Sequence, residues 1–221
     1  MGWRLNLRGN GRSYLLGTLA LPLTMLAVLG IGLATGLAAL NADATLADYV
    51  VAVIPMAIIY LVFGLFEEVG WRGYLVPRVA GWNDGLLGHV LVGVIWASWH
   101  FPYMAELWGH TDESLLTLLP RFVLGTIVFA VFYGEIRLRT GSVWPAVIMH
   151  WLGNTVANSL LSGFNGEGFI NLSPGTIWLT SPGVEGTLMI VVFAVLGGLL
   201  YTSRKRSRHV PAVAQASMIT Q

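Results

Sequence analysis

The sequence contains no cysteine, a single lysine and few charged residues, which make up 10% of its 221 residues. The absence of cysteine excludes disulfide bonds, thiolate metal sites, cysteine nucleophiles and S-acylation. Soluble domains are about 25% charged, whereas this chain is 55% hydrophobic and has a mean hydropathy of +0.70. These values indicate that lipid, rather than water, surrounds most of the folded chain.

The sequence also lacks the motifs of two common enzyme classes. It has neither a G-x-S-x-G nucleophile elbow nor a GxxxxGK[ST] phosphate loop. Its one lysine, Lys205, lies in a basic tail, 204–221, so a Ser-Lys protease dyad is not expected. Because this tail directly follows an apolar segment, we interpret its charges as a topology signal or a lipid-headgroup contact, and we expect no nucleic-acid partner.

Six apolar segments account for most of the chain, at about 14–40, 49–66, 86–104, 115–134, 142–161 and 186–203. Each approaches the ~20 residues that a helix needs to cross a bilayer. Basic residues precede the first segment, follow the sixth, and otherwise occur in every second connection, with Arg121 as the exception. This pattern obeys the positive-inside rule. We predict a single all-α membrane domain over 1–221, with about six transmembrane helices and cytoplasmic termini, in the plasma membrane.

Two segments leave room for another interpretation. The first apolar segment follows arginines and precedes LAALNADA, like a signal peptide, but it is about twice too long for one. The connection 163–183 is rich in Gly, Pro, Asn and Ser, which predicts an irregular outer loop. Three further histidines are not expected to act chemically: His89 reads as an interfacial residue, His110 lies in an acidic connection and His209 in the tail.

The stretch FEEVGWRGY places three charges directly after a segment that contains none. Glu68 and Arg72 are four residues apart, so on a helix they share a face and can pair. Glu67 is rotated by about 100° from Glu68 and has no obvious partner. A helix ending at Phe66 would leave this cluster in water; the apolar sequence up to Val79 instead favours a longer helix that submerges Glu67.

Two further polar intrusions occur in apolar segments. His100 follows HVLVGVIWASW and precedes Pro102, which is expected to end or bend the helix. His150 and Asn154 are four residues apart and share a helix face. Each group has a plain structural explanation, an aromatic belt at the membrane surface or hydrogen bonding between helices. Together, however, they supply one free carboxylate, two imidazoles and an amide, which suffice to activate a water and to stabilise an oxyanion.

Three spaced motifs contain these residues: EExxxR at 67–72, an aromatic residue four positions before a histidine at Trp96–His100, and HxxxN at 150–154. In this order, each in a predicted membrane helix, they resemble the CAAX protease and bacteriocin-processing family of intramembrane endopeptidases. The matching core is about 49–161. The aromatic residue of the second motif is usually Phe in that family, and Trp96 keeps its packing role.

The resemblance implies a role for each motif residue. Glu67 would be the general base that activates water, His100 would position that water, and His150 with Asn154 would stabilise the oxyanion. Glu68 and Arg72 would form a structural pair, with Trp96 as packing support. The implied enzyme is a glutamate-dependent hydrolase with no obligatory cofactor. A zinc-dependent version, with Glu67, His100 and His150 as ligands, stays open because spacing across three helices neither forbids nor requires it.

The resulting hypothesis is an intramembrane endopeptidase that cleaves a membrane-associated peptide or protein. The first alternative is a membrane immunity or scaffold protein of the same fold without catalysis. The second is a small transporter in which Glu67 and His100 relay protons. The complete set of motif residues favours the enzyme, and the lack of an internal repeat argues against the transporter.

Overall fold

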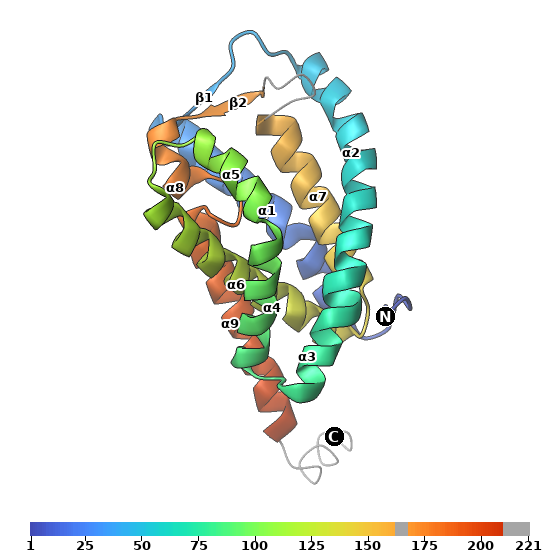
Figure 1. Ribbon diagram of the computed structural model, residues 1–221. Helices are drawn as coiled ribbons and strands as arrows, with labels where there is room; N and C mark the ends of the chain where they lie inside the picture. Colours follow the sequence, from blue (N-terminus) through green and yellow to red (C-terminus); the bar gives the residue numbers. More distant parts are fainter. Residues whose placement is uncertain (162–167, 210–221) are drawn as a thin grey trace.

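A computed structural model describes residues 1–161 and 168–209. Almost all regular structure in this part of the chain is helical (Figure 1). The elements are α1 (Gly11–Thr35), β1 (Ala38–Leu40), α2 (Leu46–Glu68), η1 (Val69–Leu75), α3 (Val76–Trp82), α4 (Leu86–Trp99), α5 (Phe101–Gly109), α6 (Leu115–Thr140), α7 (Trp144–Leu161), β2 (Ile170–Leu172), η2 (Pro174–Thr176), α8 (Ile177–Thr180) and α9 (Thr187–His209).

The predicted all-α, multi-pass membrane fold is confirmed. Within the described residues, four helical stretches are long and apolar enough to cross a membrane: Gly11–Thr35, Leu46–Trp82, Leu115–Thr140 and Thr187–Ser207. The fifth predicted span corresponds to α7, which is not among these four because its His and Asn residues lower its hydropathy. The third predicted span contains α4, which is apolar but shorter. The cytoplasmic position of the termini stays a prediction.

The helix that was expected to continue past Phe66 does so. A capping box starts α2, because the Thr45 side chain accepts from the Asp48 N–H while the Asp48 carboxylate accepts from the Thr45 N–H. From Leu46 the helix runs through α2, the π-helical turn η1 and α3 to Trp82, 37 residues in all. The EExxxR motif therefore lies inside a continuous helix, at its transition into the π-helical turn.

One predicted segment boundary was wrong. The first segment was expected to stay helical to residue 40, but α1 ends at Thr35, where Gly36 adopts a left-handed conformation, and Ala38–Leu40 forms strand β1. The break expected near Pro102 in the third segment, 86–104, is present, because α4 ends at Trp99 and a separate helix, α5, begins at Phe101. Pro102 occupies the first turn of α5, a position where its missing N–H costs nothing.

The predicted irregular connection 163–183 is partly ordered. Strand β2 pairs antiparallel with β1, with Ala38 opposite Leu172, and α8 follows. The residues 162–167 lie outside the described part of the chain.

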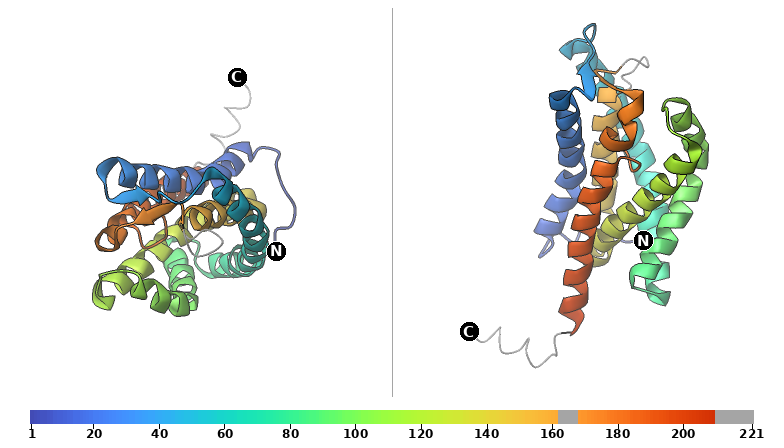
Figure 2. Two further views of the ribbon diagram at one scale, coloured as in Figure 1. Left: turned by 90° about the horizontal axis from the view of Figure 1, so that it is seen from above. Right: turned by 90° about the vertical axis from the view of Figure 1, so that its left-hand side faces the viewer.

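Helix α6 lies at the centre of the bundle, packed against α4 on one side and α9 on the other (Figures 1 and 2). It contributes Phe129, Ala130, Phe132, Tyr133 and Ile136 to the main core. The neighbouring pair α2 and α7 packs beside it, and α1 covers α7. The start of α1 and the end of α9 both lie beside the end of α6, since Tyr14 contacts Ser142 and Arg204 contacts Glu135.

Candidate active site

Glu68, Arg72 and His150 form a buried hydrogen-bonded group that joins the first motif to the third. Arg72 Nη1 donates to Glu68 Oε1 at 3.0 Å, so the pair expected from the i, i+4 spacing is present. The same carboxylate oxygen bonds His150 Nδ1 at 2.9 Å. Because an ionised carboxylate only accepts, His150 carries its proton on Nδ1, and its Nε2 is the nitrogen left for other chemistry.

Glu68 and His150 can form their hydrogen bond because α2 and α7 pack closely together. Gly64 lies one turn before Glu68, and a Cβ built there would sit 3.3 Å from the Trp151 backbone nitrogen and 3.5 Å from His150 Cβ. A larger side chain would push the two helices apart. The Trp151 indole also donates to the Ala57 carbonyl at 2.7 Å, which fixes α7 along α2. No local pattern in the sequence indicates this role of Gly64.

Two aromatic rings and a second arginine hold Arg72. Its guanidinium carbon lies 3.9 Å from the centre of the Trp96 ring and 4.2 Å from that of Tyr133. Both rings are buried, a setting in which a cation–π contact is strongest. Arg137 Nε donates to the Arg72 carbonyl at 2.8 Å. Trp96 therefore supports the site, as expected, while Tyr133 and Arg137 are additional supports that the motifs did not identify.

Glu67 lies on a different face from Glu68 and is half-buried. The Trp71 indole donates to its carboxylate at 3.3 Å, a partner that the sequence analysis did not foresee. Glu67 lines a groove of about 670 Å³, whose remaining walls are nearly all apolar or aromatic and include Phe66, Tyr74 and Trp99. Several of these side chains are exposed, so the groove opens on the outer surface of the bundle.

His100 occupies the junction between α4 and α5. Its Nδ1 donates to the Trp96 carbonyl at 2.9 Å, because a carbonyl oxygen only accepts. Its ring packs against Trp96 and Phe122, and Nε2 is again the nitrogen left for other chemistry. Trp96 thus connects His100 to the buried Arg72 group. Asn154 lies one helical turn after His150 on α7 and is half-buried.

The structure therefore gathers the three motifs around Trp96, Arg72 and Glu68. No hydrogen bond or ion pair among the described residues joins Glu67 to His100 or to His150. The catalytic roles of Glu67, His100, His150 and Asn154 stay predictions.

A three-residue metal site was the alternative for these groups. Among the described residues, no group of three or more His, Asp and Glu side chains is close enough to hold a metal ion. The proposed ligands Glu67, His100 and His150 are thus not arranged as a ready set, and His150 Nδ1 already bonds Glu68.

A second buried polar group overturns two expectations. His89 was read as interfacial, but it is buried and its Nε2 bonds Glu135 Oε1 at 2.9 Å. Arg204 was read as part of a topology or headgroup signal, but it is buried and donates to both oxygens of Glu135 at 2.7 Å. The sequence analysis did not consider Glu135. This acidic residue directly follows an apolar segment, and a buried acid in such a position needs a partner.

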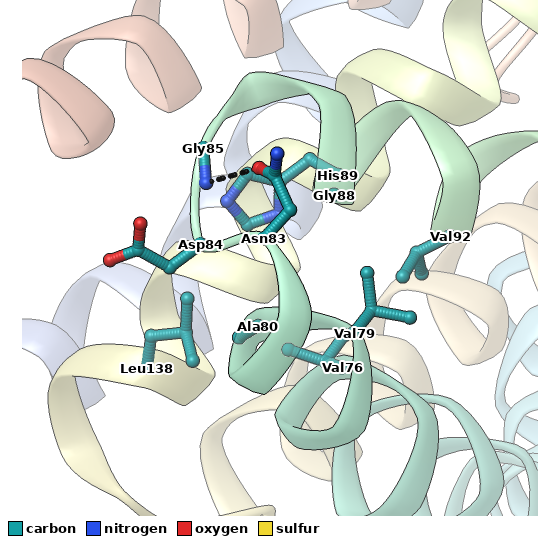
Figure 3. Close-up of a pocket in the computed structure, with 10 residues that line it drawn as sticks. All are labelled: Val76, Val79, Ala80, Asn83, Asp84, Gly85, Gly88, His89, Val92 and Leu138. Carbon is teal, nitrogen blue, oxygen red and sulfur yellow. Dashed lines mark hydrogen bonds between the residues drawn. The ribbon is translucent and has the colours of Figure 1, made fainter.

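This second group lies where the turn between α3 and α4 meets the ends of α6 and α9. Arg204 and Lys205 both bond the Asp84 carboxylate, at 3.2 and 2.7 Å. Figure 3 shows Asp84 and His89 beside this turn, in which Asn83 accepts from the Gly85 N–H at 2.8 Å. The small cavity drawn there is lined mainly by apolar side chains. Residues 210–221 of the basic tail lie outside the described part of the chain.

Two comparisons with known proteins support the family resemblance. Residues 49–156 match the family model described as type II CAAX prenyl endopeptidase Rce1-like. A curated CAAX prenyl protease 2 from Methanococcus maripaludis is 35% identical over 112 residues, which cover 46% of this chain and 39% of that protein. No solved structure matches the chain. The resemblance seen in the three motifs is therefore confirmed.

Proposed function

We propose, from the relationship of residues 49–156 to the Rce1-like type II CAAX prenyl endopeptidases, that this chain is an intramembrane endopeptidase. The observation that carries the proposal is the 2.9 Å bond between His150 and Glu68, because it brings the first and third motifs into one buried site. The chain spans about two fifths of the curated relative that it matches, 39% of its length, so substrate identity is proposed on chemistry alone.

Glu67 is the proposed general base. Its carboxylate lies in a groove with almost entirely apolar walls, where it can accept a proton from a water beside a bound peptide. His100 directs its Nε2 lone pair to the water, since its Nδ1 proton is held by the Trp96 carbonyl. The Glu67 carboxylate of the first motif and His100 Nε2 of the second motif would then each accept a hydrogen bond from the attacking water and so orient both of its protons.

His150 and Asn154 are the proposed oxyanion donors. Glu68 holds the Nδ1 proton of His150 and stabilises the ring when it is protonated. A second proton, taken up from solvent on Nε2, makes the ring an imidazolium whose Nε2–H would bind the developing oxyanion, and the Asn154 amide on the next turn of α7 would add a second donor. Glu67 would pass the proton that it takes from water to the leaving amine as the C–N bond breaks, so no covalent intermediate is needed.

The proposed substrate is a peptide or protein held at or in the bilayer, in the plasma membrane. The groove that contains Glu67 is open on the outside of the bundle and is lined by exposed Phe66 and Trp99. An apolar segment already in the membrane can reach such a groove without passing through water.

The test compares the membrane peptides of cells that carry the native chain with those of cells that carry Glu67→Gln. We expect a precursor to accumulate in the variant cells and its cleaved product to disappear. Glu67→Gln is nearly isosteric, and the amount and thermal unfolding of the purified variant control for its folding. Identical peptide profiles from a well-folded variant would contradict the protease and favour the immunity or scaffold alternative.

A second arm tests the zinc version. Product formation that persists after removal of divalent metal, in a preparation whose metal content is measured, supports the glutamate mechanism. Loss of the product on chelation and its return with zinc would favour the metal-dependent version.

A further inference from the structure

Four buried polar atoms beside His150 have no hydrogen-bond partner among the described residues. They are Glu68 Oε2, Arg72 Nε, Arg72 Nη2 and Trp96 Nε1, and they make up four of the six such side-chain atoms in this part of the chain. Buried polar groups are nearly always hydrogen-bonded, because an unmade bond leaves their desolvation uncompensated. Their concentration in three residues points to a bound partner rather than to scattered packing defects.

Arg72 contacts both of the other two residues. Arg72 bonds Glu68 through Nη1 at 3.0 Å, and its guanidinium carbon lies 3.9 Å from the centre of the Trp96 ring. The Nε–H and one Nη2–H of a guanidinium point the same way, along the edge that faces away from Nη1. The free atoms of Arg72 are therefore the two donors of a single fork, which is the arrangement that binds oxygen ligands.

The chemistry of the four atoms selects the class of ligand. Arg72 and Trp96 need an acceptor, whereas Glu68 Oε2, as a carboxylate oxygen, needs a donor. A carboxylate or a phosphodiester could satisfy the three N–H groups but has no proton for Glu68. A metal cation could satisfy Glu68 but would be repelled by Arg72. Water both accepts and donates, and it is the small neutral ligand that matches the whole set.

Two protein groups close to Arg72 in sequence are already engaged elsewhere. The Glu67 carboxylate, the nearest acidic group in sequence, accepts from the Trp71 indole and lines the outer groove. The Arg72 carbonyl accepts from Arg137, and Arg137 supplies another donor rather than an acceptor.

We infer that the core of this protein contains an ordered-water site, in which one or more waters accept from the Arg72 fork and the Trp96 indole and donate to Glu68 Oε2. The waters complete the hydrogen bonds of Glu68, whose other oxygen holds His150, and so help to fix the direction of the His150 ring. The water site is inferred from the four unpaired polar atoms, and it does not depend on the proposed protease activity.

The first test is an experimental structure of the full chain in lipid at a resolution that shows ordered water. We expect water density within hydrogen-bonding distance of Arg72 Nε or Nη2 and also of Glu68 Oε2 or Trp96 Nε1. A fork bonded instead to a protein group, such as a reoriented Glu67 carboxylate, would overturn the inference, as would a fork with no density beside it.

The second test uses X-ray hydroxyl-radical labelling, in which bound water is converted to radicals that oxidise the side chains next to it. Trp96 is 5% exposed, so bulk solvent barely reaches it. We expect Trp96 to be oxidised much faster than Phe132 and Phe193, which are buried aromatic residues of the apolar core. Trp96 oxidation no faster than that of these two controls would contradict the water site. Because neither test measures hydrolysis, failure here is distinguishable from failure of the proposed function.

Discussion

His150 and Glu68 are separated by 82 positions in the sequence and share a buried 2.9 Å hydrogen bond. The neighbouring Glu67 has no such contact and faces the outer groove instead. The two adjacent acids therefore have different surroundings: Glu68 is buried in the core between an arginine and a histidine, and Glu67 lines a groove on the outside of the bundle.

The Glu68→Gln variant is expected to lose stability, because it leaves the fully buried Arg72 without its counter-charge. Removing one partner of a buried ion pair costs about 3–5 kcal/mol. The measurement is thermal or denaturant unfolding in a mild detergent. Glu67→Gln is the matched control: its side chain is half-buried and pairs with no cation among the described residues, so we expect the variant to unfold within about 1 kcal/mol of the native protein. Equal losses in the two variants would contradict the assignment of Glu68 to the core.

Replacing Tyr133 tests the aromatic support of Arg72. Tyr133→Phe keeps the ring 4.2 Å from the guanidinium carbon and should retain most of the stability. Tyr133→Leu removes the ring and should cost about 2 kcal/mol or more, the value of a desolvated cation–π contact, together with lost packing. Stability is measured as before, and equal effects of Phe and Leu would show that the ring face contributes nothing.

The role of the last helix is tested by a pair of arginines two positions apart. Arg204→Ala leaves the buried Glu135 without its bidentate partner and is expected to destabilise the protein by about 3–5 kcal/mol. Arg206 is exposed, and its replacement by Ala should change stability by no more than about 0.5 kcal/mol. Similar effects of both variants on unfolding would indicate that Arg204 acts only as a general positive charge.

Glu185, just before α9, should make stability depend on pH. Burial raises the pKa of its carboxyl above the usual value, although a hydrogen bond from Ser181 and the nearby Arg121 oppose the shift. The folded state therefore prefers the protonated acid. Its contribution to stability is complete below the pKa of the unfolded chain, about 4.3 for glutamate, and is lost as pH rises through the raised folded pKa.

The Glu185→Gln variant cannot ionise and should lack this loss. We expect the Tm difference between variant and native protein to move in favour of the variant as pH rises from about 4 to 8, following the sign of the linkage. A difference that moves the other way would show that the ionised Glu185 carboxylate is the preferred folded form.

Much of the fold was readable from composition and spacing. Long apolar segments predicted the membrane helices, and the apolar sequence after Phe66 correctly predicted that the second helix continues through the EExxxR motif, although it reaches Trp82 rather than about Val76. Pro102 correctly predicted the break between α4 and α5. The prediction failed where local conformation overrides hydropathy, because Gly36 ends α1 before the apolar stretch is complete.

The second polar group shows a different limit. The positive-inside rule treats Arg204 as a charge near the membrane surface, independent of any partner. In the folded chain it reaches Glu135, 69 positions away, and His89 joins the same carboxylate. Neither contact can be predicted from the spacing of nearby residues, because the partners lie on three different helices.

The sequence by itself determined that this chain folds in lipid and that Glu68 lies beside Arg72 and His150 beside Asn154, since the period of a helix fixes which residues share a face. Only the tertiary structure decided that Glu68, rather than Glu67, meets His150. Adjacent helical residues point about 100° apart, and which of them faces the core depends on how α2 is rotated against α7. That rotation is set by contacts such as Gly64 against Trp151, between residues too far apart in the chain for any local pattern to reveal.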